Sequence, residues 1–264
     1  SLKMRLRMKN FEPDNGGKET KKEGYPFVAL RETDIAGNKS KFFRVPGMPN
    51  IIVRNSFIRA VGETSQALST KAQAEYLKGK IDEFKKIIEK YPVRAAKTDY
   101  VIGADSVLGN PSIYCVTEVI NGESLENLHF LSKETADKID NLYEKIIADF
   151  VVSYFKNGYF WFDPTNEQFM FGKARGDKKP DIYLVDVDPN VFKWNDGELE
   201  RRFGLKRETW FLVRILQIAR ELNDLEKKVT ENTTVFFKTR KKIERLKRKM
   251  PEIIKNRRKH HADS

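Results

Sequence analysis

Cysteine and histidine are scarce in this 264-residue chain, and their scarcity excludes several kinds of chemistry. The single cysteine, Cys115, allows neither an internal disulfide framework nor a cysteine-based metal cluster, and it favours a reducing compartment. Two of the three histidines, His260 and His261, lie in the last five residues, so histidine catalysis and histidine-rich metal sites are not expected. We therefore predict a cytoplasmic protein, either bacterial or, for a secreted effector, in a host cell.

Long apolar runs are also absent. No run approaches the ~18–20 apolar residues of a membrane-spanning helix, so no transmembrane segment is predicted. The basic start, SLKMRLRMK, lacks the apolar core and the cleavage site of a secretory signal. Apolar residues still make up 39% of the chain, enough for a folded core, and charged residues make up 33%, which predicts long solvated helices.

Positive charge is concentrated near the C-terminal end. The net charge is +12, and residues 227–264 supply +10 of it, from 14 Lys and Arg against four Asp and Glu. The remaining 226 residues are nearly neutral. The high isoelectric point therefore describes a basic tail and does not by itself indicate a nucleic-acid-binding domain.

The first half of the chain reads as strands around one helix. Residues 1–22 are polar and Gly-rich and are predicted to be flexible. Strands are predicted at 25–32, 40–45, 50–57, 98–105 and 111–120. Turn residues separate the first three strands, which indicates an antiparallel meander. Apolar residues at helical spacing predict a long helix over 64–91, ended by Pro92.

The second half reads as mainly helical. A turn into a short helix is expected at 121–128. A strong helix is predicted from Ser132, as its N-cap, to a stop at Gly158, and another over 206–225. A small hairpin at 157–171 lies between them. Because strands and helices do not alternate, a doubly wound parallel sheet is not expected.

We predict an α+β fold with a small antiparallel-sheet lobe followed by a mainly helical lobe. The expected domains are a flexible segment at 1–22, a sheet-rich lobe with its long helix at 23–120, a helical lobe with the hairpin at 121–226, and a basic helical tail at 227–264.

Acidic and amide side chains occupy turns in this helical lobe. Asp163 lies in a Pro turn, and Gln168 follows it by five residues. Asp186 ends the predicted strand in DIYLVDVDP, and Asp188 follows two residues later. Asp beside Pro favours a turn, so simple turn and cap roles explain each aspartate. Oxygen ligands of these types also suit Mg²⁺, which makes a phosphate-and-metal site the alternative.

The order of these segments resembles the protein-kinase-like superfamily, including its small-molecule and bacterial minimal-kinase branches, over about residues 25–224. The family's catalytic loop reads H-x-D-x-x-x-x-N, followed by two apolar residues. Trp161, Asp163 and Gln168 occupy those places here. The metal-binding D-F-G resembles DVD at 186–188.

The resemblance implies a two-lobed fold, with ATP and Mg²⁺ as cofactors. It gives Asp163 the role of the acceptor-side carboxylate and Asp186 that of a metal ligand. Gln168 would ligate a second metal, and Asp188 is an additional carboxylate where the family has glycine. The hinge resembles residues 116–122, where Glu118 and Ile120 would contact the nucleotide.

In the sheet lobe, Arg54 stands where the family has its phosphate-pairing lysine. Its helix partner would be Glu75, with Glu83 as the second choice. The Gly-rich loop resembles TDIAGNKS, which has one glycine, Gly37.

Four residues depart from the family pattern, namely Arg54, Trp161, Gln168 and Asp188. There is also no A-P-E sequence after Asp186, so a conventional protein-substrate platform is not expected and the acceptor is unidentified. Three functions therefore stay open. The first is an ATP- and Mg²⁺-dependent phosphotransferase, and the second is a pseudokinase that serves as a binding or scaffold module. The third is a binder of nucleic acid or anionic surfaces through the basic tail.

The tail has its own alternatives. Four apolar residues recur at helical spacing and predict one apolar face. They are Ile243, Leu246, Met250 and Ile253. Pro251 suits the first turn of a second short helix. The tail either docks on the body with a solvated basic face, or binds an anionic membrane surface or nucleic acid through residues 227–264. Few aromatics beyond Phe236 and Phe237 interleave with the charge, so base stacking is not indicated.

Overall fold

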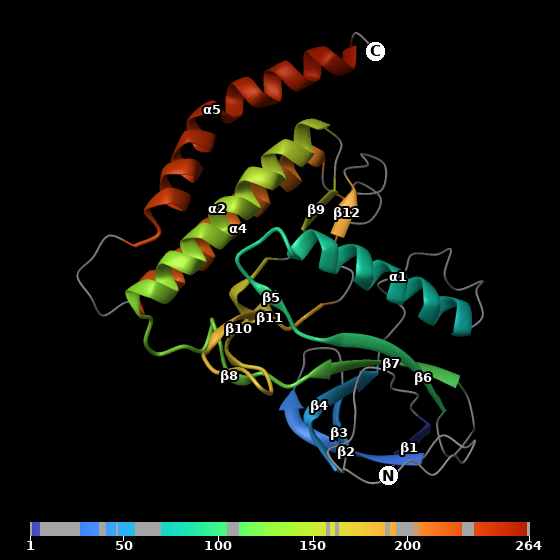
Figure 1. Ribbon diagram of the computed structural model, residues 1–264. Coiled ribbons are helices and arrows are strands. Elements are labelled where there is room, and N and C mark those ends of the chain that lie inside the picture. Colours follow the sequence, from blue (N-terminus) through green and yellow to red (C-terminus); the bar gives the residue numbers. More distant parts are fainter. Residues whose placement is uncertain are drawn as a thin grey trace. The chain divides into compact units, whose positions relative to one another are not determined.

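Figure 1 shows the computed structural model of the chain. The structure describes residues 2–5, 27–36, 41–45, 47–55, 70–104, 111–156, 159–161, 164–187, 191–193, 204, 206–228 and 235–262. The chain divides into two compact units. The first comprises Ser1–Ile88, Ala95–Gly122 and Gly172–Pro189, and the second comprises Glu89–Arg94, Glu123–Phe171 and Asn190–Ser264. Helices and antiparallel strands are both present, which confirms the predicted α+β class.

A six-stranded sheet forms the first unit's main layer, in the order β1-β2-β3-β4-β7-β6. Its strands are β1 (Leu2–Arg5), β2 (Phe27–Ala36), β3 (Lys41–Val45), β4 (Met48–Asn55), β6 (Thr98–Ala104) and β7 (Pro111–Glu118). Strands β2, β3 and β4 form the predicted antiparallel meander. Strand β1 lies within residues 1–22, where a flexible segment and no strand was predicted, and it pairs with β2.

Alternation along β4 sorts its side chains between the two faces of this sheet. Ile51 and Val53 are buried in the apolar cluster that also contains Val116 of β7. Because successive side chains of a strand point to opposite faces, Arg54 lies on the other face from Val53. Arg54 is partly buried there. The strand therefore presents a cation on the face opposite its apolar core.

Helix α1 (Thr70–Ile88) packs against β6 in the same unit. Its buried face carries Leu77, Ile81, Phe84 and Ile88, as helical spacing predicts. The helix ends before the predicted stop at Pro92, and a turn at 89–90 follows. Polar contacts fix it along β6, because Lys78 forms an ion pair with Asp99 at 3.1 Å and Lys85 donates to the Thr98 carbonyl at 3.1 Å.

A four-stranded sheet has the order β5-β11-β10-β8. Its strands are β5 (Arg94–Ala95), β8 (Asn121–Ser124), β10 (Phe169–Lys173) and β11 (Asp181–Leu184). The expectation of a turn into a short helix at 121–128 is wrong, since 121–124 is strand and 125–127 is turn. Gly172 is one reason why residues 121–124 can form a strand next to β10. A Cβ there would lie 2.5 Å from the Asn121 carbonyl oxygen, so only glycine allows β8 to approach this closely.

The long helices among the described residues of the second unit are α2 (Lys133–Lys156), α4 (Arg207–Glu226) and α5 (Phe237–Ala262). Ser132 caps α2 as predicted, because its Oγ accepts from the Thr135 amide at 3.3 Å. The rings of Phe150 on α2 and Phe211 on α4 stack with centroids 5.0 Å apart. The unit also contains the antiparallel pair β9 (Tyr159–Trp161) and β12 (Val191–Lys193). The predicted hairpin at 157–171 is therefore wrong, because β9 pairs with β12 while β10 lies between β11 and β8 in another sheet.

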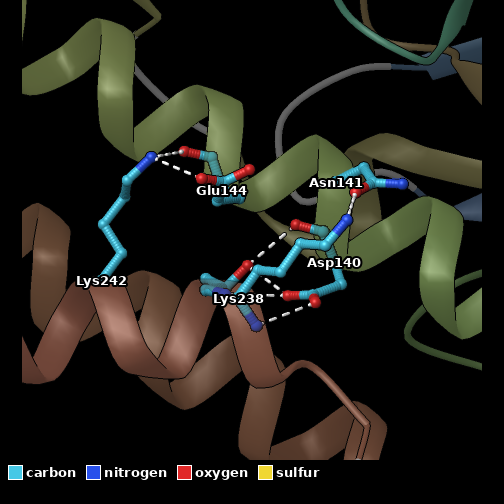
Figure 2. Close-up of polar contacts among 6 residues, drawn as sticks. Asp140, Asn141, Glu144, Lys238 and Lys242 are labelled. Carbon is cyan, nitrogen blue, oxygen red and sulfur yellow. Dashed lines mark hydrogen bonds and ion pairs between the residues drawn. The ribbon is translucent and has the colours of Figure 1, made fainter.

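Figure 2 shows how α5 is attached to α2. The Asp140 carboxylate accepts from the amides of Lys238 at 3.1 Å and Thr239 at 2.9 Å, and from the Thr239 hydroxyl at 2.6 Å. Asp140 therefore caps the first turn of another helix, where the amide groups have no partner within the helix. One turn further along, Lys242 Nζ forms an ion pair with Glu144 at 2.7 Å.

The apolar face of α5 is used in this packing. Ile243, Leu246 and Met250 are buried, as the spacing predicts, and the side chain of Ile253 lies outside the described residues. Pro251 does not begin a second helix but lies inside α5. Figure 1 shows that α5 is bent, which a proline inside a helix explains. No helix of the described residues is long and apolar enough to cross a membrane.

Candidate functional site

An ion pair joins two predicted site residues within the first unit. Arg54 Nη2 donates to Asp186 Oδ1 at 2.9 Å, across 132 residues of sequence. Arg54 comes from β4, and Asp186 follows the end of β11 by two residues. Their side chains are 19% and 31% exposed. The pair is therefore partly screened from water and still accessible to a ligand.

The chemistry of this pair suits a nucleotide phosphate with its metal. A guanidinium binds phosphate oxygens through paired N–H donors. A carboxylate supplies the oxygen ligand that Mg²⁺ favours. When no ligand is bound, the two groups neutralise each other. A magnesium phosphate would offer each of them the complementary charge, the phosphate to Arg54 and the metal to Asp186.

The predicted hinge follows the end of β7. The Glu118 side chain accepts from the Lys97 amide at 2.8 Å, and the Glu118 amide donates to the Lys97 carbonyl at 2.9 Å. The Val119 amide donates to the Asn50 carbonyl at 2.8 Å. Ile120 is buried. These contacts hold the segment to residues on or beside the neighbouring strands β4 and β6, and they use the amides of residues 118 and 119 within the fold.

The predicted helix partners of Arg54 lie on α1, where Glu75 and Glu83 both have exposed side chains. The pairing of Arg54 with either of them stays a prediction.

In the second unit, Asn166 anchors the loop that precedes β10. Its Oδ1 accepts from the Tyr143 hydroxyl of α2 at 2.8 Å, and its amide donates to Glu221 Oε2 of α4 at 2.8 Å. Its Nδ2 donates to the Glu221 carbonyl at 2.9 Å. Asn166 is 3% exposed. This network holds the loop between two helices, and sequence reasoning missed it because no local pattern marks the partners.

Gln168 follows this anchor, at the end of the 3₁₀ turn Asn166–Gln168. It is buried, and its Oε1 has no hydrogen-bond partner within the described part of the chain. Thr165 Oγ1 is likewise buried without a partner there. An unpaired buried acceptor costs free energy, so a bound cation or donor would relieve the cost. Gln168 therefore fits the predicted metal-ligand role.

The other predicted site residues are only partly described. Asp163 and Asp188 lie outside the described residues, and Trp161 is the last residue of β9. Asp186 belongs to the first unit and Gln168 to the second. Among the described residues, no group of three or more His, Cys, Asp and Glu side chains could hold a metal ion. The structure thus brings together Arg54 and Asp186 of the predicted set.

No protein-family model matches the chain, and no curated protein matches its sequence. Among solved structures, it is similar to the MAP kinase LmaMPK10 from Leishmania major, with 11% sequence identity and a TM-score of 0.39. The similarity covers 81% of this chain and 61% of that kinase, so the chain matches less than two thirds of the kinase's length. At this TM-score the similarity does not establish a shared fold.

Proposed function

We propose that the chain is a kinase-like protein that binds a magnesium nucleotide and transfers its terminal phosphoryl group to an alcohol acceptor. The observation that carries this proposal is the ion pair between Arg54 and Asp186. A cation from a sheet strand and a metal-binding carboxylate from an acidic turn are two of the groups that hold the nucleotide phosphates for phosphoryl transfer. ATP is the proposed nucleotide.

Each proposed role follows from the chemistry of the side chain. When bound, Mg²⁺ neutralises the charge on the phosphates. Asp186 is the proposed ligand of this metal, and Gln168 is proposed to ligate a second metal, a role that its buried Oε1 supports because no described residue hydrogen-bonds to it. Asp188 is a further carboxylate ligand. Arg54 binds the phosphate oxygens, and Asp163 accepts the hydrogen bond of the acceptor hydroxyl.

The base of the nucleotide is proposed to bind along the hinge at 116–122. The amides of Glu118 and Val119 already donate to main-chain carbonyls. The next main-chain amide belongs to Ile120, which we assign as the donor to the base. The Glu118 carbonyl is the proposed acceptor.

A pseudokinase is the second candidate, and the residues that replace the family's catalytic set favour it. Trp161 stands in place of histidine and Gln168 in place of asparagine. Such a protein would keep the nucleotide site and lose phosphoryl transfer. The two candidates predict the same binding and different turnover, so one set of measurements separates them.

The first experiment is thermal melting of the full chain with and without ATP and Mg²⁺. At one hundred times its dissociation constant, a ligand stabilises the native state by about 2.7 kcal/mol. For a protein of this size that corresponds to a rise of roughly 5–10 °C in Tm. Asp186→Ala should abolish the metal-dependent part of the rise. Asp82→Ala, which removes an exposed carboxylate from α1, is the matched control and should retain the full rise.

The second experiment follows transfer of the labelled terminal phosphate of ATP to water, to the protein or to small alcohols. Turnover that is lost in both Asp163→Ala and Asp186→Ala supports the phosphotransferase. Nucleotide binding without turnover identifies the pseudokinase. Absence of any nucleotide-dependent rise in the wild-type Tm would refute both candidates.

A further inference from the structure

A groove lies between α4 and α5, and none of the residues that line it is assigned to the nucleotide. Its volume is about 490 Å³. Its lining includes Ala219, Asn223, Phe237, Lys241, Lys247 and Arg248. All of these belong to the second unit, whereas Arg54 and Asp186 belong to the first. The groove is therefore a separate candidate binding site.

The lining is strongly cationic. Glu244 is the one acidic residue among the residues that line the groove. Lys241, Lys247 and Arg248 are exposed, and no ion pair joins them to another described residue. Arg240 is different, because it donates to Asn223 Oδ1 at 3.0 Å and also binds a carboxylate of α4. Three cations thus remain for an anionic ligand.

Not every cation of α5 is available in this way. Lys238 Nζ donates to Asn141 Oδ1 at 2.8 Å, and Lys242 binds Glu144, as Figure 2 shows. These two lysines hold α5 on α2. The structure therefore separates the tail's positive charge into a part that serves the fold and a part that lines the groove.

An aromatic ring accompanies these cations. Phe237, the first residue of α5, is 57% exposed, and Lys241 Nζ lies 5.5 Å from its ring centroid. The preceding Phe236 is 1% exposed and has a positive φ of 57°. Phe236 therefore anchors the chain in the core, while its neighbour offers an open ring beside positive charge. The sequence pattern did not indicate base stacking, and the exposure of this ring is the observation that motivates proposing it.

We propose that the groove binds single-stranded nucleic acid, with a base stacked on Phe237 and phosphates on Lys241, Lys247 and Arg248. A cationic channel with an exposed aromatic ring is the arrangement that binds single strands without sequence preference. The lining is complementary to repeated negative charge on a flexible backbone, and Asn223 offers an amide to a base or sugar.

The same observations disfavour a membrane surface as the occupant. A helix that lies in a bilayer interface buries an apolar face among the lipids. In α5 that face, formed by Ile243, Leu246 and Met250, is already buried within the protein. Phe237 is the one exposed large apolar side chain that the described part of α5 offers. A ring beside three cations suits a base and its phosphates better than it suits acyl chains.

The test is fluorescence anisotropy of a labelled oligothymidylate of about 20 nucleotides, titrated with the full chain at several salt concentrations. Each phosphate contact of a single strand contributes about −0.7 to the slope of log K against log salt. Three contacts predict a slope of about −2, and about 20-fold weaker binding when salt rises from about 50 to about 200 mM.

Matched variants separate the groove from general attraction to a basic helix. The double variant Lys247→Ala/Arg248→Ala removes two lining cations and should reduce the slope to about −0.7. The control Arg245→Ala/Lys249→Ala removes two exposed cations of the same helix that do not line the groove, and it should keep the wild-type slope.

Substitutions of the ring test stacking. Phe237→Ala should weaken binding at least about fivefold, the lower end for loss of one base stack. Phe237→Trp should retain binding because it keeps an aromatic face. Because the ring is exposed, neither variant is expected to unfold the protein. Asp186→Ala should bind the oligonucleotide like wild type, whatever it does to ATP binding.

Four results would overturn the proposal. The first is no binding to the oligonucleotide at the lowest salt, and the second is an equal loss of affinity in the two double variants. The third is equal affinity for a duplex of the same length. The fourth is binding to vesicles of phosphatidylcholine and phosphatidylserine without binding to the oligonucleotide.

Discussion

Replacement of Asp140 by alanine is expected to release the first turn of α5 from α2. The Asp140 carboxylate accepts three hydrogen bonds from the start of α5, two from amides and one from the Thr239 hydroxyl. The Asp140 main-chain carbonyl also accepts a hydrogen bond from the Thr239 hydroxyl at 2.8 Å, and an alanine at position 140 would keep this bond. The variant therefore removes a cap without removing the whole junction.

The magnitude follows from burial. Loss of a helix cap costs about 1 kcal/mol. Thr239 is 0% exposed, so its amide would also be left without a hydrogen-bond partner. An unsatisfied buried amide costs a further ~1–3 kcal/mol. The sum is a loss of about 2–4 kcal/mol in the free energy of opening α5. Glu144→Ala is the control, because its partly exposed pair with Lys242 should contribute no more than about 1 kcal/mol.

Hydrogen exchange of the amides in the first two turns of α5 measures this loss directly. Exchange through local opening reports the free energy of that opening, whether or not the two units unfold together. Asp140→Ala should speed exchange there by a factor of about 30 to about 1000. Exchange as slow as in Glu144→Ala would show that the carboxylate does not cap α5, and the account of the tail's attachment would fail.

Two further predictions concern glycine and tyrosine. Gly172→Ala should lower the free energy of unfolding by about 1–3 kcal/mol, because its Cβ would meet the backbone of residues 121–122 at 2.5–2.9 Å. Gly79→Ala, in open space on α1, should raise the free energy of unfolding by up to about 1 kcal/mol. Denaturation midpoints equal to that of the wild type would contradict both predictions. Burial raises the pKa of Tyr91, and Asp149 raises it further. Below about pH 10 the folded and unfolded states both keep this proton, and above it only the folded state does, so stability should fall by about 1.4 kcal/mol per pH unit. Tyr91→Phe should lessen that fall in denaturation curves at about pH 9 to 11, and parallel curves for the two proteins would refute the assignment.

The regular elements with strong periodicity were predictable from local pattern. The spacing of Leu77, Ile81 and Phe84 places one apolar face on α1, and the structure buries all three. Ser132 was identifiable as the cap of α2 because capping depends on residues only three positions apart. The strand β8 was not predictable. Its pairing depends on Gly172, about 50 residues later, which admits the close approach.

The candidate site shows the same division. Arg54 and Asp186 were each identifiable from residue type and position beside a predicted strand. Their 2.9 Å contact is decided by the fold, since 132 residues separate them. Asn166 was missed altogether, because its partners lie 23 and 55 residues away and come from two different helices.

By itself the sequence determined the α+β class, the faces of the helices and the concentration of positive charge in the tail. These properties depend on composition and on residues a few positions apart, which the chain carries whether or not it is folded. Only the tertiary structure decided how the tail's charge is used. It commits Lys238 and Lys242 to α2 and leaves Lys247 and Arg248 in the groove, because burial and partner distance are set by packing between helices.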